Sequence, residues 1–325
     1  MSSPTPIQSL IGGMGIPLAA HELLVLNGNI FGISGFLHSA VRGSVEGLAG
    51  AAGLVLGGMI VANLEGAGPA TTPLSASQMA LSGLLVGLGT KLANGCTSGH
   101  MICGISRFSI RSIAATATFF LTGVLTTLIL HGNQPAAAPP DWTLGMSGVK
   151  LLALQAIPFG ISALLYALNS KSDKPEKNAP VPARKALRIL AYFATSVQFA
   201  LALRLSNLSE ASRVLSFLVL PFNRGFDPSL AFVAGGAVSL GIFLYHCARG
   251  SERPRLGGVW SIPKGGKIDV RLLVGSTMFG IGWGMAGICP GPGLVNLGRA
   301  LGSGGSSLLP YTTWIGSMVV GGILA

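Results

Sequence analysis

Cysteine thiols in two glycine-rich segments are the side chains of this chain best suited to chemistry. A Gly-x-Gly precedes Cys96 in GLGTKLANGCTSGHMICG, residues 87–104, and a second Gly-x-Gly precedes Cys289 in GIGWGMAGICPGPG, residues 280–293. The glycines stand nine and seven residues before the cysteine in both segments. Each segment is expected to end an apolar helix in a loop with a soft, polarizable ligand at the break. Membrane proteins place such broken helices where a substrate crosses the middle of the bilayer.

Two other kinds of thiol chemistry are considered for these loops. Cys96, His100 and Cys103 form C-x3-H-x2-C, a spacing that suggests a metal. Zinc would need a fourth ligand, and the second loop offers only PGPG, so no metal and no other cofactor is predicted. A redox or sulfur-transferring enzyme would use a thiolate of lowered pKa beside a cation. In the second loop, proline and glycine rather than Lys or Arg lie next to Cys289, which argues against an enzyme.

The composition is that of a protein with many membrane spans. Half of the 325 residues are hydrophobic, 10% are charged, and 48 are glycine. The net charge of +11 does not indicate nucleic acid, because the cations lie in short loops without interleaved aromatic residues. The N-terminal apolar run follows no Lys or Arg and is expected to remain as a span rather than to be removed as a signal.

Apolar runs of about 20 residues predict nine transmembrane helices. Shorter runs are expected to form half-helices or interfacial turns. Lys and Arg gather in segments 170–186 and 249–269, which places both in the cytoplasm, while segments 65–73 and 132–146 contain neither residue. The N-terminus is then outside and the C-terminus cytoplasmic. The predicted spans are 7–26, 45–64, 74–93, 111–131, 147–169, 187–206, 228–248, 270–287 and 308–325. The short runs are 33–42, 211–220 and 293–302. The cations that remain in segments predicted to lie outside are Arg213, Arg224 and Arg299.

This topology turns the two cysteine loops toward each other from opposite sides of the membrane. The predicted fold is therefore all-α, with two inverted-topology repeats, re-entrant helices and facing cysteine loops. Residues 1–146 form the first repeat, 147–186 a connecting span with a flexible hydrophilic linker, and 187–325 the second repeat. The dipeptides Pro290-Gly291 and Pro292-Gly293 are expected to break the eighth span.

The motif NGCTSGHMICGISRFSIRS resembles the GCTSGHGxCGxSRxSxRS signature of the YeeE/YedE sulfur-transport family. The segments FDPSLAFVAGGA and GWGMAGICPGPGLVNLG resemble the companion half of that family, so that two halves are fused in one chain. The resemblance implies import of thiosulfate or a related sulfur anion past thiols of two inverted loops. It assigns Cys96 and Cys289 to this constriction and makes Cys103 a candidate. Some relatives carry another cysteine near the first loop, where this chain offers Ser34.

These residue types suit a sulfur-bearing anion. Glycine-rich loops expose backbone N–H groups, and a neutral cysteine adds a weak S–H donor and a polarizable sulfur. Weak contacts also allow the ion to leave. His100 either contacts substrate or is satisfied by backbone carbonyls. The residues assigned to the pathway are Cys96, Cys289, Cys103, His100, Gly95, Thr97, Ser98, Pro290 and Gly291.

Several further polar groups have both a functional and a structural interpretation. Glu22, beside His21 in the first span, either belongs to the pathway or bonds a neighbouring backbone group. Lys91 reaches the membrane surface and adds positive potential at the pore mouth, and Ser34 is a further candidate. Cys247 is interpreted as a packing residue.

The predicted function is import of thiosulfate, with sulfite, selenium species or another small anion as alternative cargo, and not enzymatic catalysis. The membrane redox or sulfurtransfer enzyme remains the alternative class. No G-x4-G-K-[ST] nucleotide-binding loop is present in the sequence. The expected partners are the sulfur anion, the lipid bilayer and a cytosolic sulfurtransferase at the basic linker, with no nucleic acid. The expected location is a plasma membrane or bacterial inner membrane.

Overall fold

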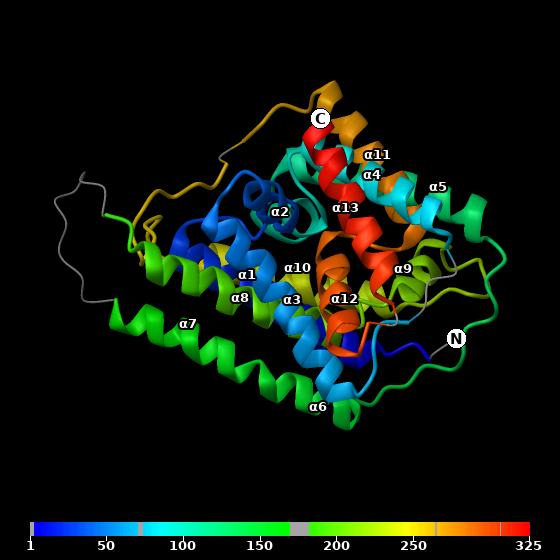
Figure 1. Ribbon diagram of the computed structural model, residues 1–325, viewed down its shortest axis with the longest axis horizontal. Helices are drawn as coiled ribbons and strands as arrows, with labels where there is room; N and C mark the ends of the chain where they lie inside the picture. The colour runs from blue at the N-terminus through cyan, green and yellow to red at the C-terminus, as the bar shows by residue number, and fades with distance from the viewer. Residues whose placement is uncertain (1–2, 71–73, 170–181, 264, 306) are drawn as a thin grey trace.

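Helices make up most of the residues that the computed structural model describes, 3–70, 74–169, 182–263, 265–305 and 307–325 (Figure 1). These residues contain no β-strand. The helices in chain order are α1 (Pro6–Asn27), α2 (Ile33–Val41), α3 (Val45–Glu65), α4 (Ala76–Ala93), the π-helix η1 (Ser98–Gly104), the 3₁₀ turn η2 (Ile105–Arg107), α5 (Ile110–His131), α6 (Gly145–Leu154), α7 (Ala156–Leu168), α8 (Lys185–Leu205), α9 (Ala211–Leu218), α10 (Ser229–Phe243), the π-helix η3 (Leu244–Ala248), α11 (Val270–Ala286), α12 (Pro290–Gly302) and α13 (Leu308–Leu324).

Seven helical segments of the described chain are long and apolar enough to cross a membrane: α1, α3, α5, α6 with α7, α8, α10 with η3, and α11 with α12. The predicted spans 74–93 and 308–325 correspond to α4 and α13, but α13 is shorter and α4 is not among the seven. The protein is therefore an all-helical membrane protein, and the count of nine spans stays a prediction. The three short runs form α2, α9 and α12, as predicted. The linker falls mostly outside the described residues.

The repeated Gly-x-Gly pairs bring four helices into close contact. A Cβ atom on Gly87 of α4 would overlap the Met318 carbonyl of α13, and one on Gly280 of α11 would overlap the Phe119 carbonyl of α5. Neither contact leaves room for any larger side chain. The helices α4 and α11 also pack against each other and run antiparallel, with the Ser82 hydroxyl donating to the Gly282 carbonyl at 2.8 Å. The paired motifs thus join the two segments that precede the cysteines.

Helices α3 and α8 run parallel and are joined by ion pairs near both ends. Arg188 contacts Glu46 at 2.7 Å near the start of the two helices, and Arg204 contacts Glu65 at 2.5 Å near their C-terminal ends. At 1.5 Å per residue these pairs lie about 24–29 Å apart, close to the thickness of a bilayer's hydrocarbon core of about 30 Å. The spacing is that expected of two pairs that lie near opposite edges of a membrane.

Arg299 extends the second ion pair into a four-residue network. Its guanidinium contacts Glu65 at 3.1 Å and Glu210 at 3.0 Å, and Arg204 contacts Glu210 at 2.7 Å. Arg213 pairs separately with Asp227 at 3.0 Å. These contacts explain two of the three cations that departed from the expected charge bias, because their charges are balanced by carboxylates.

The same packing pattern occurs twice. Helix α1 packs beside α10 and runs parallel to it, with Thr5 beside Ser229 near their starts and Pro17 beside Gly241 further on, as α3 does with α8. Helix α1 packs antiparallel to α8, where Gln198 donates to Glu22. Helices α6 and α7 lie along one edge of the molecule (Figure 1), against α8.

Candidate functional site

Both cysteine loops begin where a helix ends in a left-handed residue. Helix α4 ends at Asn94, whose φ is 56°, and the Gly95 amide donates to the Thr90 carbonyl at 3.0 Å. Helix α11 ends at Gly287, whose φ is 68°. Such C-caps stop a helix cleanly. Cys96 and Cys289 follow at once, so each thiol occupies a break between two helices.

The Pro-Gly pairs do not break the helix, and this prediction was wrong in its mechanism. The break lies at Gly287, before both prolines, and Pro290 is the first residue of α12. Proline suits that position because a backbone N–H in the first turn of a helix has no acceptor within the helix, so its absence costs nothing there. The φ angle of proline is also already close to the helical value. The prolines therefore begin α12 and leave Cys289 as its N-cap.

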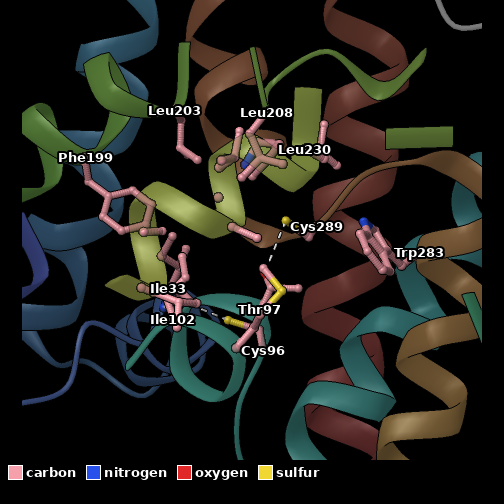
Figure 2. A pocket seen from close by; sticks show the side chains of 18 of the residues that line it. Ile33, Cys96, Thr97, Ile102, Phe199, Leu203, Leu208, Leu230, Trp283 and Cys289 are labelled. Atoms are coloured by element: carbon pink, nitrogen blue, oxygen red, sulfur yellow. Dashed lines mark hydrogen bonds between the residues drawn. The ribbon is translucent and has the colours of Figure 1, made fainter. Parts of the chain in front are cut away.

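The two thiols line one buried cavity, which we call the thiol chamber. Figure 2 shows Cys96 and Thr97 reaching it from one loop and Cys289 from the other. The Thr97 hydroxyl donates to the Cys289 sulfur at 3.4 Å, and the Cys96 sulfur lies 3.3 Å from the Ser98 hydroxyl. The chamber holds about 60 Å³ of free space. The structure thus brings together the segments that the matching spacings singled out.

The remaining wall of the thiol chamber is apolar. Of the described residues that line it, none is charged. The wall opposite the two loops is formed by Phe199, Leu203, Leu208 and Leu230 (Figure 2). A lining without carboxylates avoids repelling an anion, but it also means that any bound charge depends on neutral donors.

Trp283 is a lining residue that the sequence reasoning missed. Its side chain is 4% exposed, and its indole N–H has no acceptor among the described residues. A buried unpaired donor costs about 1–3 kcal/mol, so its presence at a cavity wall points to a ligand that accepts from it. The signal was in the sequence, since Trp283 lies inside the second repeated motif.

The other predicted residues occupy different places. Gly291 lines the thiol chamber with Pro292, whereas Pro290 is buried outside its lining. Cys103 lines a separate small cavity with His21, on the far side of Ile102. Gly95, His100, Ser34 and Lys91 line a third, larger cavity.

His100 is held by protein groups on both ring nitrogens. Nε2 lies 3.2 Å from the Ala93 carbonyl and therefore donates, so Nδ1 accepts from the Ser112 hydroxyl at 3.1 Å. A Cβ atom on Gly95 would lie 2.6 Å from this ring. The geometry matches the interpretation of His100 as a satisfied structural residue. The predicted absence of a metal stays a prediction.

Glu22 and Cys247 lie outside the cavities described above. The Glu22 carboxylate accepts from Gln198 at 2.8 Å between α1 and α8. Cys247 is exposed, so its interpretation as a packing residue was wrong. It lies in η3, where the chain leaves the helical bundle, and for that reason the surrounding helices do not cover it.

A thin septum separates the thiol chamber from the third cavity. Ile33 and Ser98 line the thiol chamber, while their neighbours Ser34 and Gly99 line the other side. The Ile33 amide donates to the Ser98 hydroxyl at 3.3 Å and joins the two segments of the septum. Residues adjacent in sequence therefore line the two cavities at this point.

A bundle of apolar helices with an internal chamber between two helix breaks has the architecture of a membrane transporter. Comparison with known proteins agrees. A probable transporter of Xylella fastidiosa strain 9a5c is 40% identical over 128 residues, which cover 38% of this chain and 95% of the relative. A probable transporter of strain Temecula1 is 38% identical over 117 residues, covering 36% of this chain and 78% of the relative.

The two halves of the chain match different family models. Residues 9–126 match the model described as sulphur transport, and residues 187–325 match a family of unknown function, DUF6691. No solved structure matches the chain. The chain belongs to the YeeE/YedE sulfur-transport family.

Proposed function

We propose that the protein imports thiosulfate or a closely related sulfur anion through the thiol chamber. The observation that carries this proposal is the convergence of Cys96 and Cys289, from two loops far apart in sequence, on one buried chamber with Thr97 between them. A family defined by sulphur transport supports a sulfur-containing cargo.

Neutral donors give the chamber the properties of a passage rather than a tight binding site. Two thiols and the Trp283 indole N–H can each donate to an anion, while the Thr97 hydroxyl donates its hydrogen to the Cys289 sulfur and so holds that thiol in place. Thiols are weak donors with polarizable sulfur, which favours contact with the terminal sulfur of thiosulfate over a hard oxygen. Because each contact is weak, the anion can enter and leave without a large barrier.

The same surroundings disfavour a sulfurtransfer enzyme. A nucleophilic cysteine needs a thiolate, which a nearby cation or helix N-terminus stabilises. Cys289 lies at the N-terminus of α12, which is one such feature, but the described chamber lining contains no Lys, Arg or His that would place a cation beside either thiol. We therefore favour transport without a covalent intermediate.

We also propose that the two halves, residues 1–146 and 187–325, are inverted repeats joined through 147–186. The antiparallel pairing of α4 with α11, and of α1 with α8, supports this relation. The helix packing supports it as well, because α3 of the first half packs against α8 of the second, and α10 of the second half packs against α1 of the first. In this proposal nine spans place the N-terminus outside and the C-terminus in the cytoplasm.

Uptake of radiolabelled thiosulfate into proteoliposomes tests the function. Cys96→Ala and Cys289→Ala should each reduce uptake at least about tenfold, since each removes a donor from the lining of the thiol chamber. Cys247→Ala is the matched control and should transport as the unmodified protein does. Full uptake by both chamber variants would contradict the proposal, and a persulfide found on either cysteine by intact mass after turnover would favour the enzyme instead.

Labelling with a membrane-impermeant maleimide tests the orientation. In a Cys247→Ala background, Ala136→Cys in the loop before α6 should react from outside in intact cells. Ser251→Cys, in the loop after η3, should react only after the membrane is opened. The reverse pattern would overturn the proposed topology.

A further inference from the structure

The third cavity carries an unusual concentration of positive charge. It holds about 710 Å³ and lies between α2, the end of α4, η1, the start of α5 and the segment around Pro263. We call it the basic vestibule, after its four cations Arg42, Lys91, Arg107 and Arg111. Among the described residues that line it there is no Asp or Glu.

The contacts of its arginines leave their charges unbalanced. Arg107 donates to the Cys103 carbonyl at 2.9 Å and to the Pro263 carbonyl at 3.2 Å. Arg111 donates to the Ala93 carbonyl at 3.4 Å. Carbonyl oxygens orient a guanidinium without neutralising it. Within the described parts of the chain, none of the four vestibule cations has a carboxylate partner.

Near the C-terminal ends of α3 and α8, by contrast, arginines do have carboxylate partners. There, Arg204 and Arg299 both contact Glu65 and Glu210. Arg188 is likewise paired with Glu46 at the other end of α3 and α8, so the four vestibule cations differ from these arginines in having no carboxylate partner among the described residues. Four cations around a concave surface raise the local concentration of anions.

Helix α2 adds neutral donors to the same cavity. Ser34 and Gly35 are in its first turn and line the vestibule, and no acceptor in the described residues takes up their amide N–H groups. The start of a helix also carries a partial positive charge. The vestibule thus combines cationic side chains with backbone amide donors.

We infer that the basic vestibule is a binding site for small divalent oxyanions, of which sulfate and thiosulfate are examples. It recognises charge, whereas the thiol chamber on the other side of the septum recognises sulfur. The inference rests on the proposed function in making the vestibule part of the same route. Its defining property is different, since sulfate should bind here although it lacks the terminal sulfur for which the chamber is suited.

Calorimetric titration of the purified protein with sodium sulfate tests the inference without any transport step. Sulfate should bind at low ionic strength, and raising the salt from about 20 to 200 mM should weaken binding several-fold, because the interaction is electrostatic. The double variant Arg107→Gln/Arg111→Gln should bind about tenfold more weakly, as expected when two charge-assisted contacts are lost. Glutamine retains a donor for the carbonyl contacts, which favours correct folding.

Two matched variants separate the possible outcomes. Lys150→Gln/Arg224→Gln removes the same charge from exposed positions outside the vestibule and should bind sulfate normally. Cys96→Ala/Cys289→Ala should also bind sulfate normally. Absence of sulfate binding, or equal binding by the vestibule variant, would overturn the inference while leaving thiosulfate uptake intact. Normal sulfate binding without thiosulfate uptake by any form would overturn the proposed function instead.

A second measurement uses the unmodified protein and so does not depend on the folding of a variant. Sulfate should protect Arg107 and Arg111 from modification by phenylglyoxal, detected by peptide mass spectrometry, and should not protect Arg224. The alternative source of a dianionic group is a lipid phosphate. If native mass spectrometry shows a bound anionic lipid that prevents sulfate from binding at every concentration, the vestibule is a lipid site and the inference fails.

Discussion

Thr97 donates its hydroxyl hydrogen to the sulfur of Cys289 at 3.4 Å across 192 positions of sequence. This contact joins the two cysteine loops directly. It also holds the Cys289 sulfur in place as an acceptor, so that its own S–H remains available to a ligand.

Thr97→Val should remove this contact with little change in shape. Loss of one hydrogen bond of about 1 kcal/mol predicts a roughly fivefold rise in the KM for thiosulfate. Thr97→Ser should restore the original value. Proteoliposome uptake measures both, and Thr127→Val, which loses a hydrogen bond to Gly284 between α5 and α11, is the control. The control should lower the Tm without changing KM, and an unchanged KM in Thr97→Val would contradict the assignment.

Trp283→Phe tests the unpaired indole donor. If the N–H binds the anion, its loss should raise KM about tenfold, the effect expected for a hydrogen bond to a charged group. The thiosulfate-induced rise in Tm should shrink in the same variant. Trp314→Phe is the matched control, because its indole N–H already donates to Ser82 at 3.0 Å. Trp314→Phe should lower the Tm and leave the KM unchanged. A raised KM in Trp314→Phe together with an unchanged KM in Trp283→Phe would exclude Trp283 from the site.

Ser98→Ala should loosen the septum between the thiol chamber and the basic vestibule. It removes the acceptor of the Ile33 amide, and a loss of about 1 kcal/mol predicts roughly fivefold more frequent opening. The readout is the rate at which a charged methanethiosulfonate modifies Cys96, with the other three cysteines replaced by alanine. Ser39→Ala, whose hydroxyl bonds within α2, should leave the rate unchanged. Equal rates for all forms would show that the septum does not limit access.

Glu65→Gln should destabilise the ion network of Arg204, Glu210 and Arg299. Removing one partner from a buried network leaves an uncompensated charge and costs about 3–5 kcal/mol. The side chain of Glu65 is 9% exposed, so solvent screens this loss little. Thermal unfolding in detergent should show a clear fall in Tm, while Glu252→Gln at an exposed pair should shift it little. Equal shifts would mean that the network contributes no more than a surface pair.

The apolar runs and the repeated cysteine spacing predicted much of this structure. Runs of about 20 apolar residues specify spans almost directly, since a bilayer leaves few alternatives to a helix. The matching positions of Cys96 and Cys289 singled out the two loops that meet at the thiol chamber, while the orientation derived from charge counting stays a prediction. Both signals are local in sequence, and for that reason they were visible.

Other features depended on contacts between distant residues. The pairing of Arg299 with Glu65 joins α12 to α3, and no spacing in the chain predicts it. Cys103 follows Cys96 by seven residues, yet the π-helix η1 turns it toward another cavity. The orphaned donor of Trp283 required knowledge of what surrounds it. The segments that contain the backbone breaks were predictable, but the residue at which α11 ends and the direction of each side chain were not.

The ion pairs at both ends of α3 and α8 limit how this protein can move. These helices come from opposite halves of the chain, and α1 and α10 tie the same halves together again. A rocking motion of one half against the other would have to break both sets of contacts in every cycle. These contacts therefore predict that transport proceeds through small displacements at the septum and loops, so that the turnover rate depends on local opening rather than on large domain motion.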